Sequence, residues 1–277
     1  MTRISISIVT FRSDETLLGK TLLSLCRATQ QAMRVIPGLT SELHLIENDT
    51  VESASLHQVK QLLETGRLAT FTDVQLHASS KNLGFGGGHN QIIADLNSDV
   101  HLILNPDVEL AENSIETALN FFSGHENIGL LCPYAVSPNG SALHLCKRYP
   151  SVLDLFIRGF VPTRLQGVFQ RRLARYEMHE LISSPNPQPE IKIVSGCCMF
   201  IRTSLLQTLR GFDERFFLYF EDFDLSLRAT QVSSLAYLPS VKIVHHGGDA
   251  AKKGVQHIRL FIRSAVTFYK THGWRWT

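Results

Sequence analysis

The sequence predicts an α/β fold, with a mostly parallel central sheet flanked by helices, an irregular insertion and a C-terminal helix. Strand-like and helix-like stretches alternate with short connections through about residue 132, as is typical of parallel strands joined by helical crossovers. Residues 134–190 break this alternation and hold six of the ten prolines. The 277 residues are 44% hydrophobic, enough for a real core, and the composition excludes a disordered, collagen-like or coiled-coil chain.

The first half begins with a β-branched stretch at residues 4–11, which ends in a polar turn and is expected to form a buried strand. Ser13 and Asp14 can cap the helix that follows. This helix would turn four leucines toward one side, Leu17, Leu18, Leu22 and Leu25. The other expected elements are strands at residues 43–47, 74–77, 100–104 and 128–132, and helices at 54–65, 90–96 and 114–122.

The second half returns to regular structure after the insertion, which we expect to be mobile. The expected elements are a strand at 191–201, a short helix at 204–208, a helix at 221–230, a strand at 241–245 and a last helix at 255–271. In the last helix, the residues expected to face the core are Val255, Ile258, Ile262, Ala265 and Tyr269. Its charged residues Arg259, Arg263 and Lys270 fall on another side.

No segment predicts a membrane span or a secretory signal. The strongest apolar run, residues 193–201, is interrupted by Ser195 and Gly196 and is much shorter than the about 20 residues that a spanning helix needs. The five cysteines are an odd number without Cys-x-x-Cys spacing. We therefore expect reduced thiols and a cytoplasmic location, with Cys197 and Cys198 in the core rather than on a metal.

The formal charge of +2 conceals an uneven distribution of charge. Residues 156–176 hold five arginines and no acid, residues 250–277 hold six Lys or Arg and no acid, and the remainder has 16 basic and 25 acidic residues. Apolar residues alternate with the arginines of the first segment, and Trp274-Arg275-Trp276 closes the second. This pattern favours two surfaces that dock on an anionic membrane. An ordinary solvated surface and a nucleic-acid partner are the alternatives, and the acidic remainder disfavours nucleic acid.

Polar residues follow four of the expected strands, at the carboxyl ends where open α/β sheets bind ligands. Thr10 lies at the end of the first strand, Asn48 and Asp49 follow the second, and residues 82–90 and 105–107 follow the next two. Within Asn-Pro-Asp at 105–107, the carboxylate of Asp107 can hold a divalent cation that a diphosphate completes. The same tripeptide is also a common turn that stops a strand.

Residues 82–90 (NLGFGGGHN) contain four glycines, which allow a backbone to come close to a ligand. The helix expected from Asn90 would offer unpaired N–H groups to anionic oxygens. The segment is neither a Walker loop nor a dinucleotide fingerprint, and a purely structural flexible loop is the alternative.

Residues 216–228 (FFLYFEDFDLSLR) place Glu221, Asp222 and Asp224 at an expected helix start, directly after four aromatic residues. Acids favour the helix macrodipole there, so capping explains one or two of them. Apolar neighbours also raise the pKa of a carboxylate and suit it to act as a base, which favours a functional site. An Asp224–Arg228 pair, one helical turn apart, is expected to hold this site together.

His245 and His246 end the strand expected at 241–245. A histidine at a strand end can bind a metal or a phosphate. The alternative is an ordinary surface position, since the chain has twelve histidines.

Seven short segments occur in order along the chain: SIVTF, END, NLGFGGGHN, LNPDV, VSGCCMFIR, GFDERFFLYFEDFDLSLR and VHHGG. Together they resemble family 2 glycosyltransferases, most closely the bacterial rhamnosyltransferases of O-antigen and other surface polysaccharides. The resemblance covers nearly the whole chain and is weakest at 134–190. It implies one GT-A domain over residues 1–277, with a nucleotide-sugar-binding half (1–132) and an acceptor-binding half (133–277).

The resemblance also implies a role for each matching residue. Asp222 would be the general base of an inverting transfer, Gly196 and Glu221 would lie on the acceptor side, and Asp107 and His245 would hold Mg²⁺ or Mn²⁺. Asn105 replaces the first acid of the family's Asp-x-Asp metal motif, which removes one negative charge. The residues implied in donor binding are Thr10, Phe11, Asp49, Asn82, Gly84, Phe85, Gly86, Asn90, Asn105 and Arg228.

The implied reaction moves a sugar, foremost L-rhamnose from dTDP-L-rhamnose, to a saccharide that is carried on a lipid diphosphate at the inner face of the plasma membrane. UDP- and GDP-sugar donors are alternatives. A sugar-nucleotide pyrophosphorylase would need a basic, glycine-rich loop after the first strand, and residues 8–12 do not supply one. The intact Asp107 and Asp222 disfavour a non-catalytic protein that only binds a nucleotide sugar or a glycan.

Overall fold

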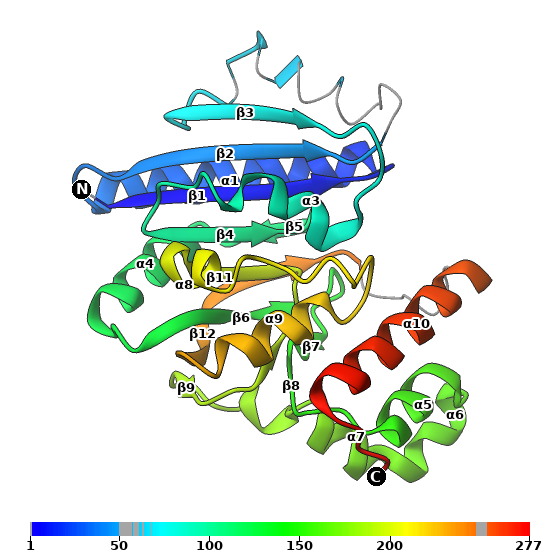
Figure 1. Cartoon of the computed structure of the whole chain (residues 1–277). Coiled ribbons are helices and arrows are strands. Elements are labelled where there is room, and N and C mark those ends of the chain that lie inside the picture. The colour runs from blue at the N-terminus through cyan, green and yellow to red at the C-terminus, as the bar shows by residue number, and fades with distance from the viewer. Residues whose placement is uncertain (1, 50–56, 58–60, 63, 67, 248–253) are drawn as a thin grey trace.

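The computed structural model describes residues 2–49, 57, 61, 62, 64–66, 68–247 and 254–277. One mixed sheet runs through the molecule with the order β3-β2-β1-β4-β11-β6-β12-β5 (Figure 1). Its first strands, all parallel to one another, are β1 (Arg3–Thr10), β2 (Thr40–Glu47), β3 (Asp73–Ala78) and β4 (Val100–Leu104). These four confirm the expected strands. The helix expected at 54–65 falls largely outside the described residues.

The second half of the chain continues the same sheet. Its strands are β5 (Val108–Leu110), β6 (Ile128–Val136), β11 (Cys198–Arg202) and β12 (Ser234–His245). β11 is antiparallel to both of its neighbours, whereas β6 and β12 pair in parallel. The short strands are β7 (Ala142–Leu143), β8 (Cys146–Lys147), β9 (Gln188–Pro189) and β10 (Ile193–Val194). The strand expected at 191–201 is therefore two strands, β10 and β11, separated by residues 195–197.

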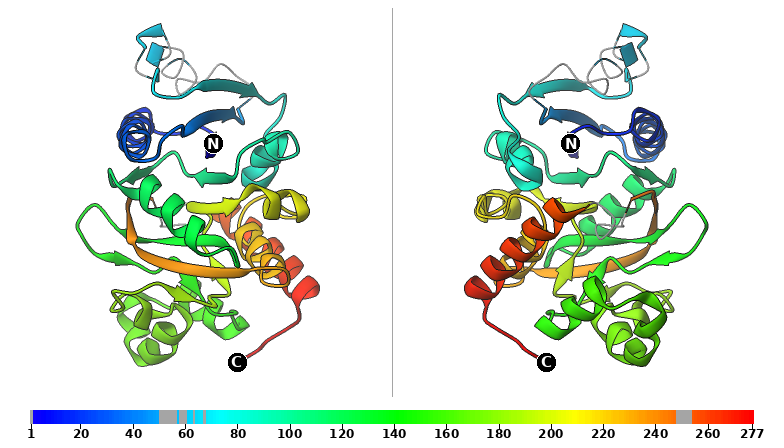
Figure 2. Two further views of the ribbon diagram at one scale, coloured as in Figure 1. Left: turned by 90° about the vertical axis from the view of Figure 1, so that its left-hand side faces the viewer. Right: turned by 90° about the vertical axis from the view of Figure 1, so that its right-hand side faces the viewer.

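Helices cover both faces of the sheet (Figure 2). One face carries α1 (Glu15–Val35) and α4 (Ser114–Gly124), and the other carries α3 (Gly84–Ile93), α8 (Thr203–Thr208), α9 (Glu221–Ala229) and α10 (Val255–His272). Asp14 caps α1 as expected, since its carboxylate accepts a 3.0 Å hydrogen bond from the N–H of Leu17. Leu18, Leu22 and Leu25 are buried against the sheet. The expected α/β architecture is thus confirmed.

The insertion, expected to be irregular, contains helices in its middle part, whereas turns and short strands make up much of the rest. It contains α5 (Val152–Phe160), α6 (Thr163–Gln166) and α7 (Gln170–Tyr176), and short 3-10 turns at Gly167–Phe169 and His179–Leu181 lie before and after α7. Pro150 and Pro162 precede helices instead of interrupting them, where a proline is tolerated. Ser151 and Asp154 form a reciprocal capping box at the start of α5. The mobility expected for this segment stays a prediction.

A second, aromatic core joins the insertion to α9 and α10. Its buried residues are Leu155, Tyr176, Phe216, Phe220, Phe268 and Tyr269. This core takes a different face of α10 from the one expected, because Phe261 and Phe268 pack toward Phe220. Tyr269 is buried and Ala265 packs on this core, as expected, but the prediction for Val255, Ile258 and Ile262 is wrong, since all three are exposed.

The five cysteines, all among the described residues, are buried and form no disulfide bond, and Cys197 and Cys198 belong to the main core as expected. Within the described part of the chain, no helix is both long enough and apolar enough to cross a membrane.

Candidate active site

The carboxyl ends of β1 and β2 meet at Glu47, a buried carboxylate that links two predicted donor residues. Thr10 Oγ1 donates to Glu47 Oε2 over 3.1 Å, and the N–H of Asp49 donates to Glu47 Oε1 over 3.0 Å. Arg12 reaches the carboxylate of Asp49 at 3.3 Å, and its guanidinium lies beside the exposed ring of Phe11. The structure therefore brings Thr10, Phe11 and Asp49 to one edge of the sheet, where Glu47 bonds Thr10 and Asp49.

The glycine-rich segment is not a loop, because α3 begins at Gly84. The N–H of Gly84 donates to Asn82 Oδ1 over 2.8 Å, and its carbonyl accepts a 2.7 Å hydrogen bond from Asn48 Nδ2. The next N–H, that of Phe85, donates to the carbonyl of Phe217 over 3.2 Å. The helix thus begins before the expected start at Asn90, and protein groups already occupy its first two N–H groups.

The glycines of α3 serve close packing. A Cβ placed on Gly84 would lie 2.0 Å from the carbonyl oxygen of Phe217, and Gly84 itself has a φ of +77°. A Cβ on Gly86 would lie 2.7 Å from Cβ of Phe212. Only glycine allows these contacts, so α3 sits directly against the segment that leads to α9. The alternative of a flexible loop is therefore wrong, whereas contacts of Asn82, Gly84, Phe85 and Gly86 with the donor stay a prediction.

Asn90 and Arg228 direct their polar groups into the protein. Asn90 exchanges two hydrogen bonds with the backbone of Phe212, at 2.8 and 2.9 Å. The guanidinium of Arg228 bonds Asp224 at 2.7 Å and the carbonyls of Leu209 and Gly211 at 2.8 Å each. The predicted Asp224–Arg228 pair is confirmed. A contact of Asn90 or Arg228 with the donor stays a prediction, and these bonds do not favour one.

Asp107 and His245 are neighbours because β5 pairs with the end of β12. Val108 lies opposite His245 in this antiparallel ladder, and the carbonyl of Asp107 accepts a 2.9 Å hydrogen bond from the N–H of His246. Asp107 Oδ1 lies 3.4 Å from His245 Nε2. Burial by itself lowers the pKa of His245, but the neighbouring Cys197 and Asp107 outweigh it and raise that pKa.

This carboxylate and imidazole fit part of the ligand set of Mg²⁺ or Mn²⁺. A Cβ on Gly247 would come within 2.2 Å of Asp107 Oδ2, so the glycine leaves room beside that oxygen. Among the residues that the structure describes, no group of three or more His, Cys, Asp or Glu side chains could hold a metal. A cation at Asp107 and His245 would therefore need further ligands, such as the oxygens of a diphosphate.

Asn105 connects this pair to the remaining site residues. Its N–H donates to the carbonyl of Cys197 over 2.9 Å, next to Gly196. Gly196 lies between Phe85 and Asp222, since an added Cβ would be 3.2 Å from the Phe85 ring and 3.1 Å from Cβ of Asp222. The segment between β10 and β11 therefore lies next to the Asp107–His245 pair, α3 and α9.

Asp222 is held by two backbone groups at the start of α9. The N–H of Gly196 donates to Oδ2 over 2.8 Å and the N–H of Phe223 donates to Oδ1 over 3.0 Å. Burial raises the pKa of Asp222 to about 6, although these two hydrogen bonds act in the opposite direction. Burial also raises the pKa of Glu221, and Glu221 Oε2 has no hydrogen-bond partner in the described part of the protein.

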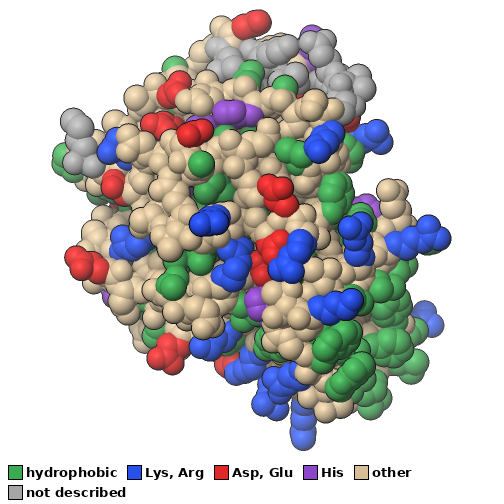
Figure 3. All heavy atoms as spheres, viewed as in Figure 1, with side chains coloured by type: hydrophobic (Ala, Val, Ile, Leu, Met, Phe, Trp, Pro, Cys, Tyr) green, Lys and Arg blue, Asp and Glu red, His purple; other side chains and the backbone are tan. Residues whose placement is uncertain are grey.

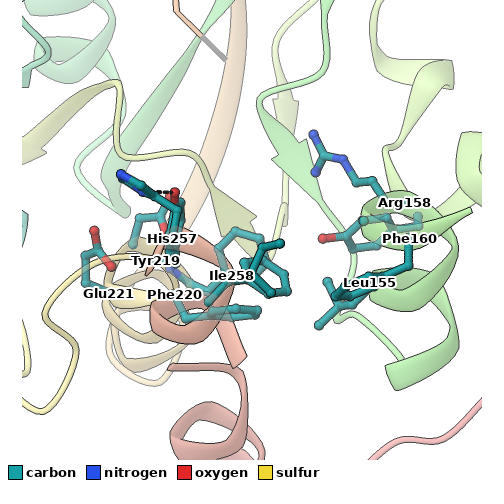
Figure 4. A pocket seen from close by; sticks show the side chains of 13 residues that line it. Leu155, Arg158, Phe160, Tyr219, Phe220, Glu221, His257 and Ile258 are labelled. Carbon is teal, nitrogen blue, oxygen red and sulfur yellow. Dashed lines mark hydrogen bonds between the residues drawn. The ribbon is translucent and has the colours of Figure 1, made fainter. Parts of the chain in front are cut away.

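Asp222 and Glu221 line a cavity of about 410 Å³ between α5, the start of α9 and α10. Figure 4 shows Leu155, Arg158 and Phe160 on one wall, facing Phe220, His257 and Ile258 on the other. On the second wall, the hydroxyl of Tyr219 and Nδ1 of His257 share a hydrogen bond of 2.8 Å. The cavity thus combines apolar walls with one carboxylate suited to act as a base.

Four residues with polar side chains line this cavity but were not among the predicted site residues: Arg158, Tyr176, Tyr219 and His257. Arg158 pairs with Glu177 at 3.3 Å, and the buried hydroxyl of Tyr176 has no hydrogen-bond partner within the described residues. Arg158 and Tyr176 had one signal in the sequence, the alternation of arginines and apolar residues in the insertion, and that alternation did not point to Asp222.

Comparison with known proteins gives the family. Residues 5–210 match the profile described as Glycosyl transferase family 2. The chain belongs to this family. The N-acetylglucosaminyl-diphospho-decaprenol L-rhamnosyltransferase of Mycobacterium tuberculosis is 29% identical to this glycosyltransferase over 229 residues, which cover 75% of this chain and 72% of the relative. Rhamnosyltransferase WbbL of Escherichia coli K12 is 22% identical over 173 residues, 58% of this chain and 61% of that protein.

Solved structures confirm the GT-A fold expected for this glycosyltransferase. Staphylococcus aureus TarS 1–349 in complex with UDP superposes with a TM-score of 0.57 at 16% identity, over 97% of this chain and 66% of that one. GalNAc-T7 with UDP, GalNAc and Mn²⁺ superposes with a TM-score of 0.60 at 16% identity, over 89% of this chain and 44% of that one. At these identities the likeness concerns the fold alone.

Proposed function

We propose that the protein is an inverting glycosyltransferase that moves L-rhamnose from dTDP-L-rhamnose to a hydroxyl of a lipid-diphosphate-linked saccharide, in bacterial surface polysaccharide synthesis. Asp222, a fixed and partly desolvated carboxylate in a cavity, carries this proposal. The names of the two rhamnosyltransferase relatives support the sugar, and the first name supports a lipid-diphosphate acceptor.

In this proposal Asp222 removes the proton from the acceptor hydroxyl as that oxygen attacks the anomeric carbon. A carboxylate with a pKa of about 6 is deprotonated at neutral pH and is a stronger base than an exposed one. The N–H groups of Gly196 and Phe223 orient its two oxygens. A single inverting displacement needs only one such base, so the second carboxylate of a glycoside hydrolase is not required.

The nucleotide diphosphate leaves on the opposite side. Asp107 and His245 would hold Mg²⁺ or Mn²⁺, which supplies positive charge to the leaving diphosphate. With Asn105 in place of an acid, the chain contributes one carboxylate fewer to that cation. We place the nucleobase and ribose near Thr10, Phe11 and Asp49. The sugar would lie toward Asn82, Gly84, Phe85 and Gly86.

The cavity beside Asp222 would receive the acceptor saccharide. Glu221 lines it, Gly196 bonds Asp222 through its N–H, and the unpartnered oxygens of Glu221 and Tyr176 offer hydrogen bonds to sugar hydroxyls. Because the acceptor is carried by a lipid, we place the protein in the cytoplasm, peripheral on the inner face of the plasma membrane.

A panel of nucleotide sugars tests the donor. Thermal unfolding is measured with dTDP-rhamnose, UDP-N-acetylglucosamine and GDP-mannose, each with and without Mn²⁺, and the best donor is then assayed for transfer to N-acetylglucosaminyl diphosphate lipid. We expect dTDP-rhamnose to give the largest stabilisation and measurable transfer. A shift with only UDP- or GDP-sugars would replace the donor, and binding without transfer to any lipid-linked saccharide would favour the non-catalytic alternative.

A further inference from the structure

The helices that form the cavity walls also carry an exposed apolar surface. Val168, after α6, is 84% exposed and Val255, at the start of α10, is 67% exposed. The whole set, which we term the α5–α10 face, comprises Phe156, Phe160, Leu165, Val168, Val255, Ile258 and Ile262. Figure 3 shows hydrophobic side chains gathered over α5, α6 and the adjoining part of α10. Clusters of this kind mark interaction sites, unlike single exposed apolar residues.

The two sides of this face are tied together by the C-terminal tail. The carbonyl of Arg275 accepts a 2.8 Å hydrogen bond from the N–H of Val152, and that of Trp276 accepts one of 3.2 Å from Leu153. Tyr149 bonds the carbonyl of Gly273, just after α10. The first turn of α5 is thus held by residues that follow α10, so the two helices present their apolar residues as one surface.

Positive charge accompanies the apolar residues. Arg164, Arg171, Arg259 and Arg263 are exposed on the same helices or directly beside them. The sequence has no Asp or Glu at 156–176 or 250–277, although acidic residues outnumber basic ones in the rest of the chain. Apolar side chains surrounded by arginines complement a bilayer with anionic headgroups, which accepts both.

We propose that the α5–α10 face docks on an anionic lipid bilayer and sets the mouth of the Asp222 cavity at the level of the headgroups. Phe160 and Ile258 line the cavity and are also exposed on this face, one on each wall. The cavity therefore opens where the bilayer would be. A lipid-linked acceptor could keep its tail in the membrane while its sugar reaches Asp222, a consequence that rests on the proposed function, whereas the docking itself does not.

Vesicle flotation tests the docking. The probes are phosphatidylcholine vesicles with and without about one third phosphatidylglycerol. The apolar variant is Phe156→Ser/Leu165→Ser/Val168→Ser. The charge variant is Arg164→Gln/Arg171→Gln. The matched control is Leu23→Ser/Arg27→Gln, which changes two exposed side chains on the distant helix α1. We expect the wild type to float with anionic vesicles and to be released by about 0.5 M NaCl. Binding should fall about fivefold for each arginine removed and at least tenfold in the apolar variant, with no change in the control.

Three results would overturn the proposal: no flotation of the wild type with anionic vesicles, equal binding to neutral vesicles, or wild-type binding by both variants. A loss of self-association in the apolar variant, seen by light scattering with unchanged flotation, would instead assign the face to a second copy of the chain.

Transfer to a short-chain, water-soluble acceptor separates this proposal from the proposed function. The apolar variant should retain that transfer and lose transfer to vesicle-bound acceptor, whereas docking without any transfer would contradict only the proposed function.

Discussion

The backbone N–H of Gly196 holds Oδ2 of Asp222 over 2.8 Å, although 26 residues separate the two in the chain. This N–H is available because the strand pairing is interrupted between β10 and β11, so that Gly196 takes part in neither ladder. The absence of a side chain at Gly196 also lets Phe85 approach from the other side. One break in the sheet therefore orients the proposed base and sets it beside α3.

Asp222→Asn should separate donor binding from catalysis. The amide keeps the size of the carboxylate but cannot take a proton, so we expect kcat to fall by roughly 10² or more while the Kd for dTDP-rhamnose changes little. In the wild type, log kcat/KM should rise with pH up to about 6 and then level off, because the active form is the deprotonated carboxylate and burial raises its pKa to about 6. The measurements are steady-state rates from about pH 5 to 8 and calorimetric donor binding.

Asp213→Asn provides the control, since this acid pairs with Arg215 in a turn away from the cavity. Unchanged turnover in Asp222→Asn, or an acid limb near pH 6 that persists in that variant, would remove Asp222 from the role of base.

Asp107→Ala should weaken metal-dependent donor binding. The chain offers a closely matched control in Glu109, which lies two residues further along and pairs with His246 at 2.6 Å much as Asp107 pairs with His245. We expect Asp107→Ala to lower the affinity for dTDP in the presence of Mn²⁺ at least about tenfold, and Glu109→Ala to leave it near the wild-type value. Calorimetric titration of dTDP with Mn²⁺ or with chelator measures both. Equal affinities with Mn²⁺ and with chelator in the wild type would contradict a metal at this site.

Gly86→Ala should destabilise the fold. Its new Cβ would meet Cβ of Phe212 at 2.7 Å, and forcing a methyl group into such a contact costs about 1–3 kcal/mol. Gly124→Ala is the control, because Gly124 is also a helical glycine, at the end of α4, but has no atom within 4 Å of the added Cβ. Urea unfolding measures the difference. A Gly86→Ala protein of wild-type stability would contradict the packing role of Gly86.

Buried histidines should make the protein sensitive to mild acid. His89 and His101 both bond the hydroxyl of Ser7, each at 2.7 Å. Burial lowers the pKa of His89 to about 3 and that of His101 well below its usual value, so both are neutral in the folded protein. In the unfolded chain they take up protons below about pH 6.5, so their contribution to stability is complete above that pH and falls as the pH drops, by about 1.4 kcal/mol per pH unit for each histidine.

Urea unfolding between about pH 7 and 5 tests this linkage. His89→Gln should reduce the slope of the unfolding free energy with pH, by up to about 1.4 kcal/mol per unit near pH 5, and the exposed His125→Gln is the control variant. The same slope in His89→Gln and the wild type would show that His89 does not contribute.

Much of the fold could be predicted because its signals are local. The β-branched residues of β1, the cap at Asp14 and the one-turn spacing of Asp224 and Arg228 act within a few residues, and each is found as expected. The site was predictable in part, because Asp107, Asp222 and His245 end or begin such elements. Glu47 and Tyr176 were missed because their roles depend on partners far along the chain.

The sequence by itself determined the α/β class, the alternation of strands and helices in the first half and, through seven ordered motifs, the glycosyltransferase family. Only the tertiary structure decided which groups meet: β5 brings Asp107 to His245, the glycines of α3 fit against Phe212 and Phe217, and the aromatic core turns Ile258 and Ile262 outward. The physical reason is that the periodicity of a helix shows that it has an apolar side, but the partner available in space decides which side is buried. For α10 that choice left an apolar stripe exposed beside the mouth of the cavity.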